Sequence, residues 1–213
     1  MIRFITFEGG DGSGKTTQLK TLENYLSERG KPCQSTCEPG GTSLGKFLRK
    51  VLLETGNQRI TSATELLLYL ADRAQHIHEV IAPALKQGKI VLCDRHTDST
   101  LAYQGYGRGI DLQLLRRLNE LVSQGIKPDL TLLLDCPVEI GLSRTAQRRS
   151  QTGAGQGEDR FEQETLEFHE RVRAGFLELA RAEPDRFRII DAAGSSRVVA
   201  EAIKNIIDQE LHK

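Results

Sequence analysis

The chain has 213 residues, a length that suits one domain with a sizeable buried core. Lysine plus arginine number 29 and aspartate plus glutamate number 29, so no net charge attracts the protein to nucleic acid or to an anionic membrane surface. No apolar run approaches the roughly 20 residues that span a bilayer, and residues 1–7 lack the pattern of a secretion signal. We expect a cytoplasmic protein with a single domain, residues 1–213, that binds neither nucleic acid nor membrane.

Short β-rich runs alternate with longer helical segments along the chain. The predicted strands are Arg3–Glu8, Cys33–Glu38, Lys89–Asp94, Leu130–Asp135 and Phe187–Asp191. The predicted helices are Gly14–Arg29, Ser43–Glu54, Ser62–Gln87, Asp111–Ser123, Val138–Arg148, Gln163–Ala182 and Ser195–Leu211. This alternation is typical of α/β proteins and predicts a mainly parallel, helix-covered sheet of five strands.

The four cysteines do not follow a metal-binding spacing. Cys33 and Cys37 are not a CxxC pair and have no histidine nearby, while Cys93 and Cys136 lie in apolar runs. We therefore expect four reduced cysteines in or near the core and no zinc site.

The first predicted strand leads into a glycine-rich loop with a phosphate-binding pattern. Its residues are Gly9, Gly10, Asp11, Gly12, Ser13, Gly14, Lys15 and Thr16, which match G-x-x-x-x-G-K-[ST]. The glycines let backbone N–H groups converge on oxygen anions, and the following helix adds the positive end of its dipole. Lys15 is the expected partner of the β- and γ-phosphates, and Thr16 is an expected Mg²⁺ ligand. This P-loop, residues 9–16, is predicted to bind ATP with Mg²⁺.

A carboxylate at the end of a neighbouring strand is expected to complete the metal site. Asp94 and Asp135 both end apolar strands, and in P-loop folds such an aspartate holds Mg²⁺ directly or through water. Asp94 is favoured because Arg95 follows it and brings a cation to the same edge of the sheet.

A second anion site is predicted at the carboxyl edge of the sheet. Arg73 and Arg95 lie in segments that should reach this edge, and so do Tyr69, Ser99, Tyr103 and Gln104. Guanidinium groups suit a phosphate, aromatic rings stack on a base and an amide reads its edge, so the set suits a nucleoside monophosphate. Ordinary helices with core-facing tyrosines are the competing interpretation.

One segment, Ser150–Gly157, has no apolar residue larger than alanine and is predicted to be a mobile surface segment. Arg144, Arg148 and Arg149 precede it, and Arg160 follows it. Arginines around a flexible segment fit a lid over phosphates, at about 144–160. A solvated loop with incidental charge explains the same pattern equally well.

Four stretches, in this order, resemble the thymidylate kinase family: Phe7–Thr17, Glu38–Thr42, Asp94–His96 with Ser99, and Ala102–Gly105 leading to Gly107–Gly109. A weaker fifth stretch is Tyr69–Arg73. The resemblance runs from the first strand to the last helix. It implies the three-layer P-loop NTPase fold, nucleoside monophosphate kinase-like with a mobile lid. It also implies a homodimer that transfers phosphate from ATP, with Mg²⁺, to dTMP in dTTP biosynthesis.

The resemblance implies roles for the residues around the acceptor nucleotide. Tyr69 matches the aromatic residue that stacks on thymine, and Arg73 and Gln104 match residues that hydrogen-bond the base. Tyr103 matches the residue that crowds the 2′ position, which favours deoxyribose.

The acceptor phosphate has implied partners as well. Arg49 and Arg95 match arginines on the dTMP phosphate, and Glu38-Pro39 matches a segment at the acceptor site that is often cis in the family. Ser99 belongs to the third matching stretch and is included in the predicted dTMP site.

Members of the family differ in where they keep a catalytic arginine. Residues 10–13 contain none, so the chain resembles the subclass whose lid supplies it, with Arg149 favoured and Arg148 left open. Asp11 would repel phosphate if bare, so it is predicted to orient Arg95, the acceptor or a metal-bound water. The predicted catalytic residues are Asp11, Lys15, Arg95, Arg148 and Arg149.

Two alternatives stay open at this point: another small P-loop nucleotide or metabolite kinase, and a binding module that NTP switches without phosphorylating a small molecule. The apolar stripe of the helix Ser62–Gln87 suits either the core or a partner; it consists of Leu66, Leu67, Leu70, Ala74, Ile77 and Ile81. Adenine contacts are expected from the lid region and from Ala192–Gly194.

Overall fold

The computed structural model describes residues 2–53, 60–152 and 160–211. Within these ranges five parallel strands form one sheet in the order β2-β3-β1-β4-β5. The strands are β1 (Phe4–Glu8), β2 (Cys33–Cys37), β3 (Ile90–Asp94), β4 (Leu130–Asp135) and β5 (Phe187–Asp191). The predicted five-stranded parallel sheet is therefore confirmed, with strand ends within one residue of those predicted.

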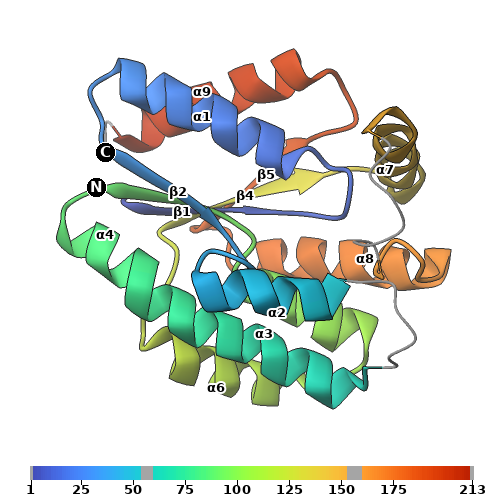
Figure 1. Cartoon of the computed structure of the whole chain (residues 1–213). Helices are drawn as coiled ribbons and strands as arrows, with labels where there is room; N and C mark the ends of the chain where they lie inside the picture. The colour runs from blue at the N-terminus through green and yellow to red at the C-terminus, as the bar shows by residue number, and fades with distance from the viewer. Residues whose placement is uncertain (1, 54–59, 153–159, 212–213) are drawn as a thin grey trace.

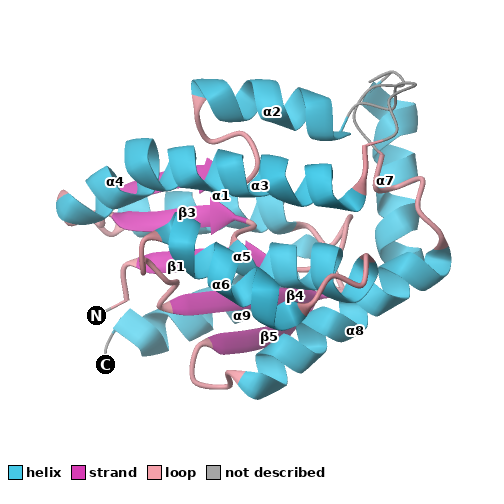
Figure 2. Ribbon diagram, turned by 90° about the horizontal axis from the view of Figure 1, so that it is seen from below, coloured by secondary structure: helices cyan, strands magenta, loops and turns pink. Residues whose placement is uncertain are grey.

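Helices cover both faces of the sheet (Figure 1). One face carries α1 (Lys15–Glu28) and α9 (Ser196–Leu211), which pack against each other. The other face carries most of the remaining helices: α2 (Ser43–Leu53), α3 (Ser62–His76), η1 (Ile77–Ile81), α4 (Ala82–Lys86), α5 (Thr97–Thr100), η2 (Leu101–Gly107), α6 (Leu112–Ser123) and α8 (Leu166–Ala182). The one helix not yet placed, α7 (Val138–Thr152), lies at one end of the molecule beside α8. The strand arrows point toward this end (Figure 2).

The core follows from the apolar faces of these layers. Every residue of β1 is buried, because the sheet's central strand has helices above and below it. One apolar cluster joins the sheet to α1 and α9, and a second joins β4 and β5 to α3, η2, α6 and α8. All four cysteines are free, with Cys93 and Cys136 buried.

Polar caps determine where several helices begin. The side chains of Thr61, Asp111 and Thr165 each accept a hydrogen bond from the backbone N–H three residues ahead. These bonds satisfy N–H groups that have no partner within the helix. Thr165 moves the start of α8 to Leu166, three residues after the predicted start at Gln163.

The predicted helix Ser62–Gln87 forms a continuous helical run, but its middle is a wider π turn at Ile77–Ile81. Pro83 follows this turn, lacks an N–H and would clash with the carbonyl of a preceding regular turn. The wider turn accommodates the proline without ending the helix.

The predicted helices included none between 95 and 110, where the structure has α5 and η2. α5 and η2 fill this region, and Gly105 and Gly107, poor helix formers, lie in η2 where neighbouring helices approach closely. A Cβ at Gly107 would lie 2.6 Å from the Phe168 ring of α8, and one at Gly105 would lie 2.5 Å from Leu112 of α6. The glycines serve packing here, which a helix-propensity argument does not register.

The predicted end of the helix Val138–Arg148 was also wrong, because the first residues of the predicted mobile segment, Ser150–Thr152, are helical. α7 continues to Thr152, and the Ser150 hydroxyl donates to the carbonyl of Gln147 within the helix. The first glycine comes only at 153, so nothing in the sequence breaks the helix earlier. The rest of the predicted segment, 153–157, lies outside the described residues.

Candidate active site

A cavity of about 350 Å³ opens at the carboxyl ends of the strands, between the P-loop, α3, η2 and α7. Every residue predicted for the acceptor site lines it: Glu38, Arg49, Tyr69, Arg73, Arg95, Ser99, Tyr103 and Gln104. The P-loop contributes Asp11, Gly12, Gly14, Lys15 and Thr16. Segments far apart in sequence therefore meet at one place, as the topology of a parallel sheet requires.

The P-loop glycines are fixed by close backbone contacts. Gly9 and Gly12 have φ values of 138° and 72°, which side-chain-bearing residues rarely adopt. A Cβ at Gly12 would lie 2.0 Å from the Gly141 carbonyl oxygen, and one at Gly9 would lie 2.5 Å from that of Leu134. α1 begins at Lys15, within the P-loop motif, so its N-terminal dipole points at the loop backbone that precedes it.

Lys15 lies inside the loop that it is predicted to serve. Its ammonium group donates to the carbonyls of Gly9 and Gly10 at 3.1 and 2.8 Å and to the Ser13 hydroxyl at 3.3 Å. Burial, with the neighbouring Arg95, lowers the pKa of Lys15 to about 8. A cation held among carbonyls at the centre of the loop suits a bound polyphosphate.

Asp94 lies beside the predicted metal ligand of the P-loop. The Thr16 hydroxyl donates to Asp94 Oδ2 at 2.6 Å. Asp135 instead accepts two hydrogen bonds from Arg173, at 2.7 and 3.0 Å. A hydroxyl and a carboxylate are hard oxygen donors that fit Mg²⁺, so the donor set favours Asp94 over Asp135.

Asp11 contacts the first of its three predicted partners, Arg95. Asp11 Oδ1 lies 2.6 Å from Arg95 Nη2, and the Tyr103 hydroxyl donates to Asp11 Oδ2 at 3.1 Å. Arg95 also donates to the Gly9 carbonyl at 3.0 Å and to the Ser99 hydroxyl at 3.2 Å. Burial raises the pKa of Asp11, but Arg95 and Lys15 outweigh it and hold that pKa below its usual value. The P-loop carboxylate thus fixes a guanidinium group in the acceptor cavity.

Glu38 and Arg73 are bound to each other. Arg73 Nε donates to Glu38 Oε2 at 2.8 Å, and both side chains are 2% exposed. The other Arg73 nitrogens donate to Thr100, Asn119 and the His96 carbonyl at 2.7–3.0 Å. Arg73 is therefore held in one orientation at the cavity wall, so it could contact a ligand only with a fixed geometry.

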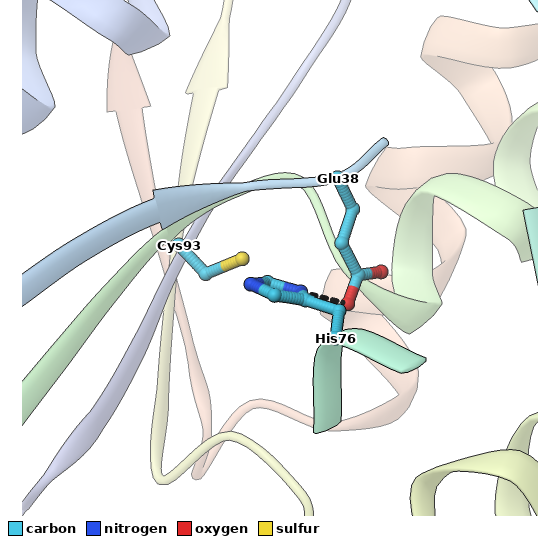
Figure 3. Close-up of side chains that lie close together, drawn as sticks. All are labelled: Glu38, His76 and Cys93. Carbon is cyan, nitrogen blue, oxygen red and sulfur yellow. Dashed lines mark hydrogen bonds and ion pairs between the residues drawn. The ribbon is translucent and has the colours of Figure 1, made fainter. Parts of the chain in front are cut away.

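Glu38 also lies in a buried cluster with His76 and Cys93 whose ligand atoms are within 4.8 Å of one another (Figure 3). Cys93 and Glu38 lie on opposite sides of the His76 ring. Nδ1 of His76 bonds Glu38 at 2.9 Å and Nε2 bonds Thr36 at 2.6 Å, so both ring nitrogens are engaged. An ion bound to one His76 nitrogen would therefore be separated by the ring from either Glu38 or Cys93, so the three residues could not all be its ligands. We interpret the cluster as a hydrogen-bond network that positions Glu38.

The cis Glu38-Pro39 peptide turns the chain at the end of β2, in agreement with the resemblance. Arg49 donates to the Pro39 carbonyl at 3.0 Å, which ties α2 to this turn. Ser99 donates to Glu8 Oε2 at 2.6 Å and so connects α5 with the end of β1.

Phe161 and Glu65 belong to this region and were missed by the sequence analysis. Phe161 lines the cavity, with its ring 5.4 Å from that of Tyr103 and 6.4 Å from that of Tyr69. Glu65 is buried and accepts a hydrogen bond from Gln104 at 2.8 Å. No local pattern marks either residue; an aromatic residue directly after a polar segment was the only signal for Phe161.

The arginines around the predicted lid have different surroundings. Arg144 donates to the carbonyls of residues 192–194 at 2.7–3.1 Å, so it ties α7 to the loop predicted to contact adenine. Arg148 lines the cavity and lies 3.7 Å from Glu162. Arg149 lies in α7, but its side chain is outside the described residues, as are residues 153–159. Arg160 bonds Glu65.

The sequence matches the family model described as thymidylate kinase over residues 7–203. The thymidylate kinase of Oleidesulfovibrio alaskensis is 53% identical over 204 residues, covering 96% of both chains. That of Solidesulfovibrio magneticus is 52% identical over 208 residues, covering 98% of this chain and all of the relative. The crystal structure of thymidylate kinase from Ehrlichia chaffeensis superposes with a TM-score of 0.77 at 37% identity, covering 96% of this chain and 98% of that one.

Proposed function

Because the chain belongs to the thymidylate kinase family, we propose that it transfers the γ-phosphoryl group of ATP to dTMP and yields ADP and dTDP for dTTP synthesis. The observation that carries this proposal is the Asp11–Arg95 pair, which joins the P-loop to the acceptor cavity at 2.6 Å. Family membership favours this activity over a switch module that does not act on a small molecule.

The acceptor is a phosphate oxygen that is already anionic at neutral pH, so no side chain has to remove a proton from it. Catalysis then consists of holding two polyanions in line and neutralising their charge. Lys15 and the P-loop amides bind the donor phosphates, and Arg95 and Arg49 bind the acceptor phosphate. Thr16 and Asp94 would hold Mg²⁺, which supplies further positive charge when bound.

The other cavity residues would bind the nucleoside of the acceptor. Tyr69 stacks on the base, Arg73 and Gln104 hydrogen-bond it, and Tyr103 disfavours a 2′-hydroxyl. Support comes from the convergence of these side chains on one cavity with Arg95.

A lid over about 144–160, inserted in a single domain spanning residues 1–213, would supply the missing positive charge. Arg148 and Arg149 are the two candidates, and Arg148 already lines the cavity. Closure of this segment would exclude water and so limit hydrolysis of ATP.

A homodimer in the cytoplasm completes the proposal. Leu66, Leu70, Ile77 and Ile81 of the α3–η1 stripe are buried in the core, but Leu67 is 62% exposed. α6, which packs against α3, exposes Leu114 at 48% and Leu121 at 73%, and exposed apolar side chains on two packed helices suit a second copy of the chain. In the part of the chain that the structure describes, no helix could cross a membrane. Light scattering should give twice the chain mass, and a monomer would contradict this part.

An acceptor panel tests the catalytic proposal. ADP release is measured with ATP and Mg²⁺ plus dTMP, dUMP, UMP, dGMP or no acceptor. Release that depends on dTMP and exceeds that with the other acceptors supports the proposal. Equal release without any acceptor would identify an NTPase, and preference for another acceptor would identify a different small kinase.

A further inference from the structure

Glu65 is a buried carboxylate at the centre of a set of hydrogen bonds behind the acceptor cavity. It lies in the first turn of α3, is 1% exposed, and does not line the cavity. Its Oε1 accepts from Gln104 Nε2 at 2.8 Å and from Arg108 Nε at 3.3 Å. Its Oε2 accepts from Arg108 Nη2 at 3.2 Å and from Arg160 Nη2 at 2.5 Å. Two guanidinium groups therefore compensate the charge that burial would otherwise make costly.

This carboxylate decides which way the Gln104 amide faces. An amide has one atom that only accepts and one that only donates, and a side chain can exchange them by a half turn. An ionised carboxylate only accepts, so Glu65 selects the Gln104 NH₂ group. With the NH₂ group bound to Glu65, the amide oxygen is the Gln104 atom that is turned away from Glu65. Gln104 lines the acceptor cavity, so this oxygen is available to a ligand there.

We propose that Glu65 is a positioning residue for base selection, which holds Gln104 so that its amide oxygen is presented to the base of the acceptor. The inference rests on the proposed function, because it requires the base to lie in the cavity that Gln104 lines. A carbonyl oxygen accepts a hydrogen bond from the N3–H of thymine or uracil. It meets a lone pair on N3 of cytosine, which has no hydrogen there, so the fixed amide rejects cytosine nucleotides.

The variant Glu65→Gln tests this. In it Arg108 and Arg160 attract the new carbonyl oxygen, so the new NH₂ faces Gln104 and favours the turned amide. The ratio of kcat/KM for dTMP over dCMP should fall by about tenfold or more, the effect of exchanging a matched hydrogen bond for a mismatched one. The ratio for dTMP over dUMP should stay within about twofold, because both bases carry N3–H.

Glu164→Gln is the matched control. Glu164 also pairs with Arg108, at 2.7 Å, but the Gln104 amide is hydrogen-bonded to Glu65 and not to Glu164, so this variant loses a carboxylate–arginine pair without turning the amide. Its dTMP-to-dCMP ratio should equal that of the unaltered protein. A second control places Glu65→Gln in a Gln104→Leu background, where it should leave that ratio unchanged.

The outcomes separate this inference from the proposed function. If the unaltered protein does not phosphorylate dTMP, the proposed function fails. If it prefers dTMP to dCMP and Glu65→Gln is folded but keeps that ratio, the inference fails. If Glu65→Gln does not fold, the test is instead the rate of hydrogen exchange of the Gln104 side-chain NH₂ group, measured in ¹⁵N-labelled unaltered protein. Slow hydrogen exchange that persists when dTMP binds supports the inference, and exchange as fast as that of exposed glutamines overturns it.

Discussion

Replacing Asp11 with alanine removes the carboxylate that holds Arg95 at the junction of the P-loop and the acceptor cavity. The bond lost is a 2.6 Å contact between ionised groups whose side chains are 23% and 18% exposed. A hydrogen bond to a charged group contributes about 1.5–3 kcal/mol. At about 1.4 kcal/mol for each factor of ten, kcat should fall roughly 10- to 150-fold if the contact acts wholly in the transition state.

The assay is steady-state ADP release, with dTMP varied at saturating ATP and, in a second series, ATP varied at saturating dTMP. The KM for ATP should change less than about threefold, because Lys15 and the loop amides are untouched. Asp11→Asn keeps an oxygen that can accept from Arg95 but loses the charge, so it should fall between the alanine variant and the unaltered protein.

Asp208→Asn is the matched control for this substitution. Asp208 accepts from the Tyr25 hydroxyl at 2.6–2.8 Å, much as Asp11 accepts from Tyr103, but it lies in α9, away from the cavity. It should leave kcat unchanged. An unchanged kcat in Asp11→Ala would refute the role assigned to the Asp11–Arg95 pair.

Three further outcomes are expected. Alanine at the catalytic lid arginine should lower kcat about 10³-fold or more, so Arg148→Ala and Arg149→Ala should differ in kcat when each is assayed separately. Equal and small losses of kcat in the two variants would contradict a catalytic lid arginine. The unaltered protein should prefer dUMP to UMP and Tyr103→Phe should narrow that preference; equal use of both by the unaltered protein would overturn the role of Tyr103. Burial and Asp98 raise the pKa of Glu8 to about 8, so the folded state binds more protons than the unfolded state between about pH 4.5 and 8. The free energy of unfolding should therefore fall as pH rises through this window. Denaturant titrations of Glu8→Gln should show a smaller fall, and the same pH dependence in both proteins would contradict this role of Glu8.

The sheet and the P-loop could be predicted because their signals are local. Apolar runs ending in Asp94 and Asp135 gave the strands within a residue, and the spacing of Gly9, Gly14 and Lys15 gave the loop. The choice between the two aspartates could not be made from the sequence with the same certainty. It depends on Arg173, which pairs with Asp135 across 38 positions of the chain.

The parts that were missed depend on contacts between distant segments. Gly105 and Gly107 of η2 allow close packing against α6 and α8, and helix propensity gives no sign of this helix because glycine disfavours one. The orientation of Gln104 depends on Glu65, 39 positions earlier, and that carboxylate in turn on Arg160, 95 positions later. The sequence analysis identified the polar acceptor-site residues that line the cavity, but it missed Phe161 in the cavity wall and the buried Glu65 that holds Gln104.

The most direct test of the central claim is to follow both products of one reaction. The protein is incubated with ATP, Mg²⁺ and dTMP, and the nucleotides are separated by anion-exchange chromatography. We predict one dTDP formed for each ADP released, and no more than a trace of ADP when dTMP is left out. ADP accumulating without dTDP would contradict phosphoryl transfer to this acceptor.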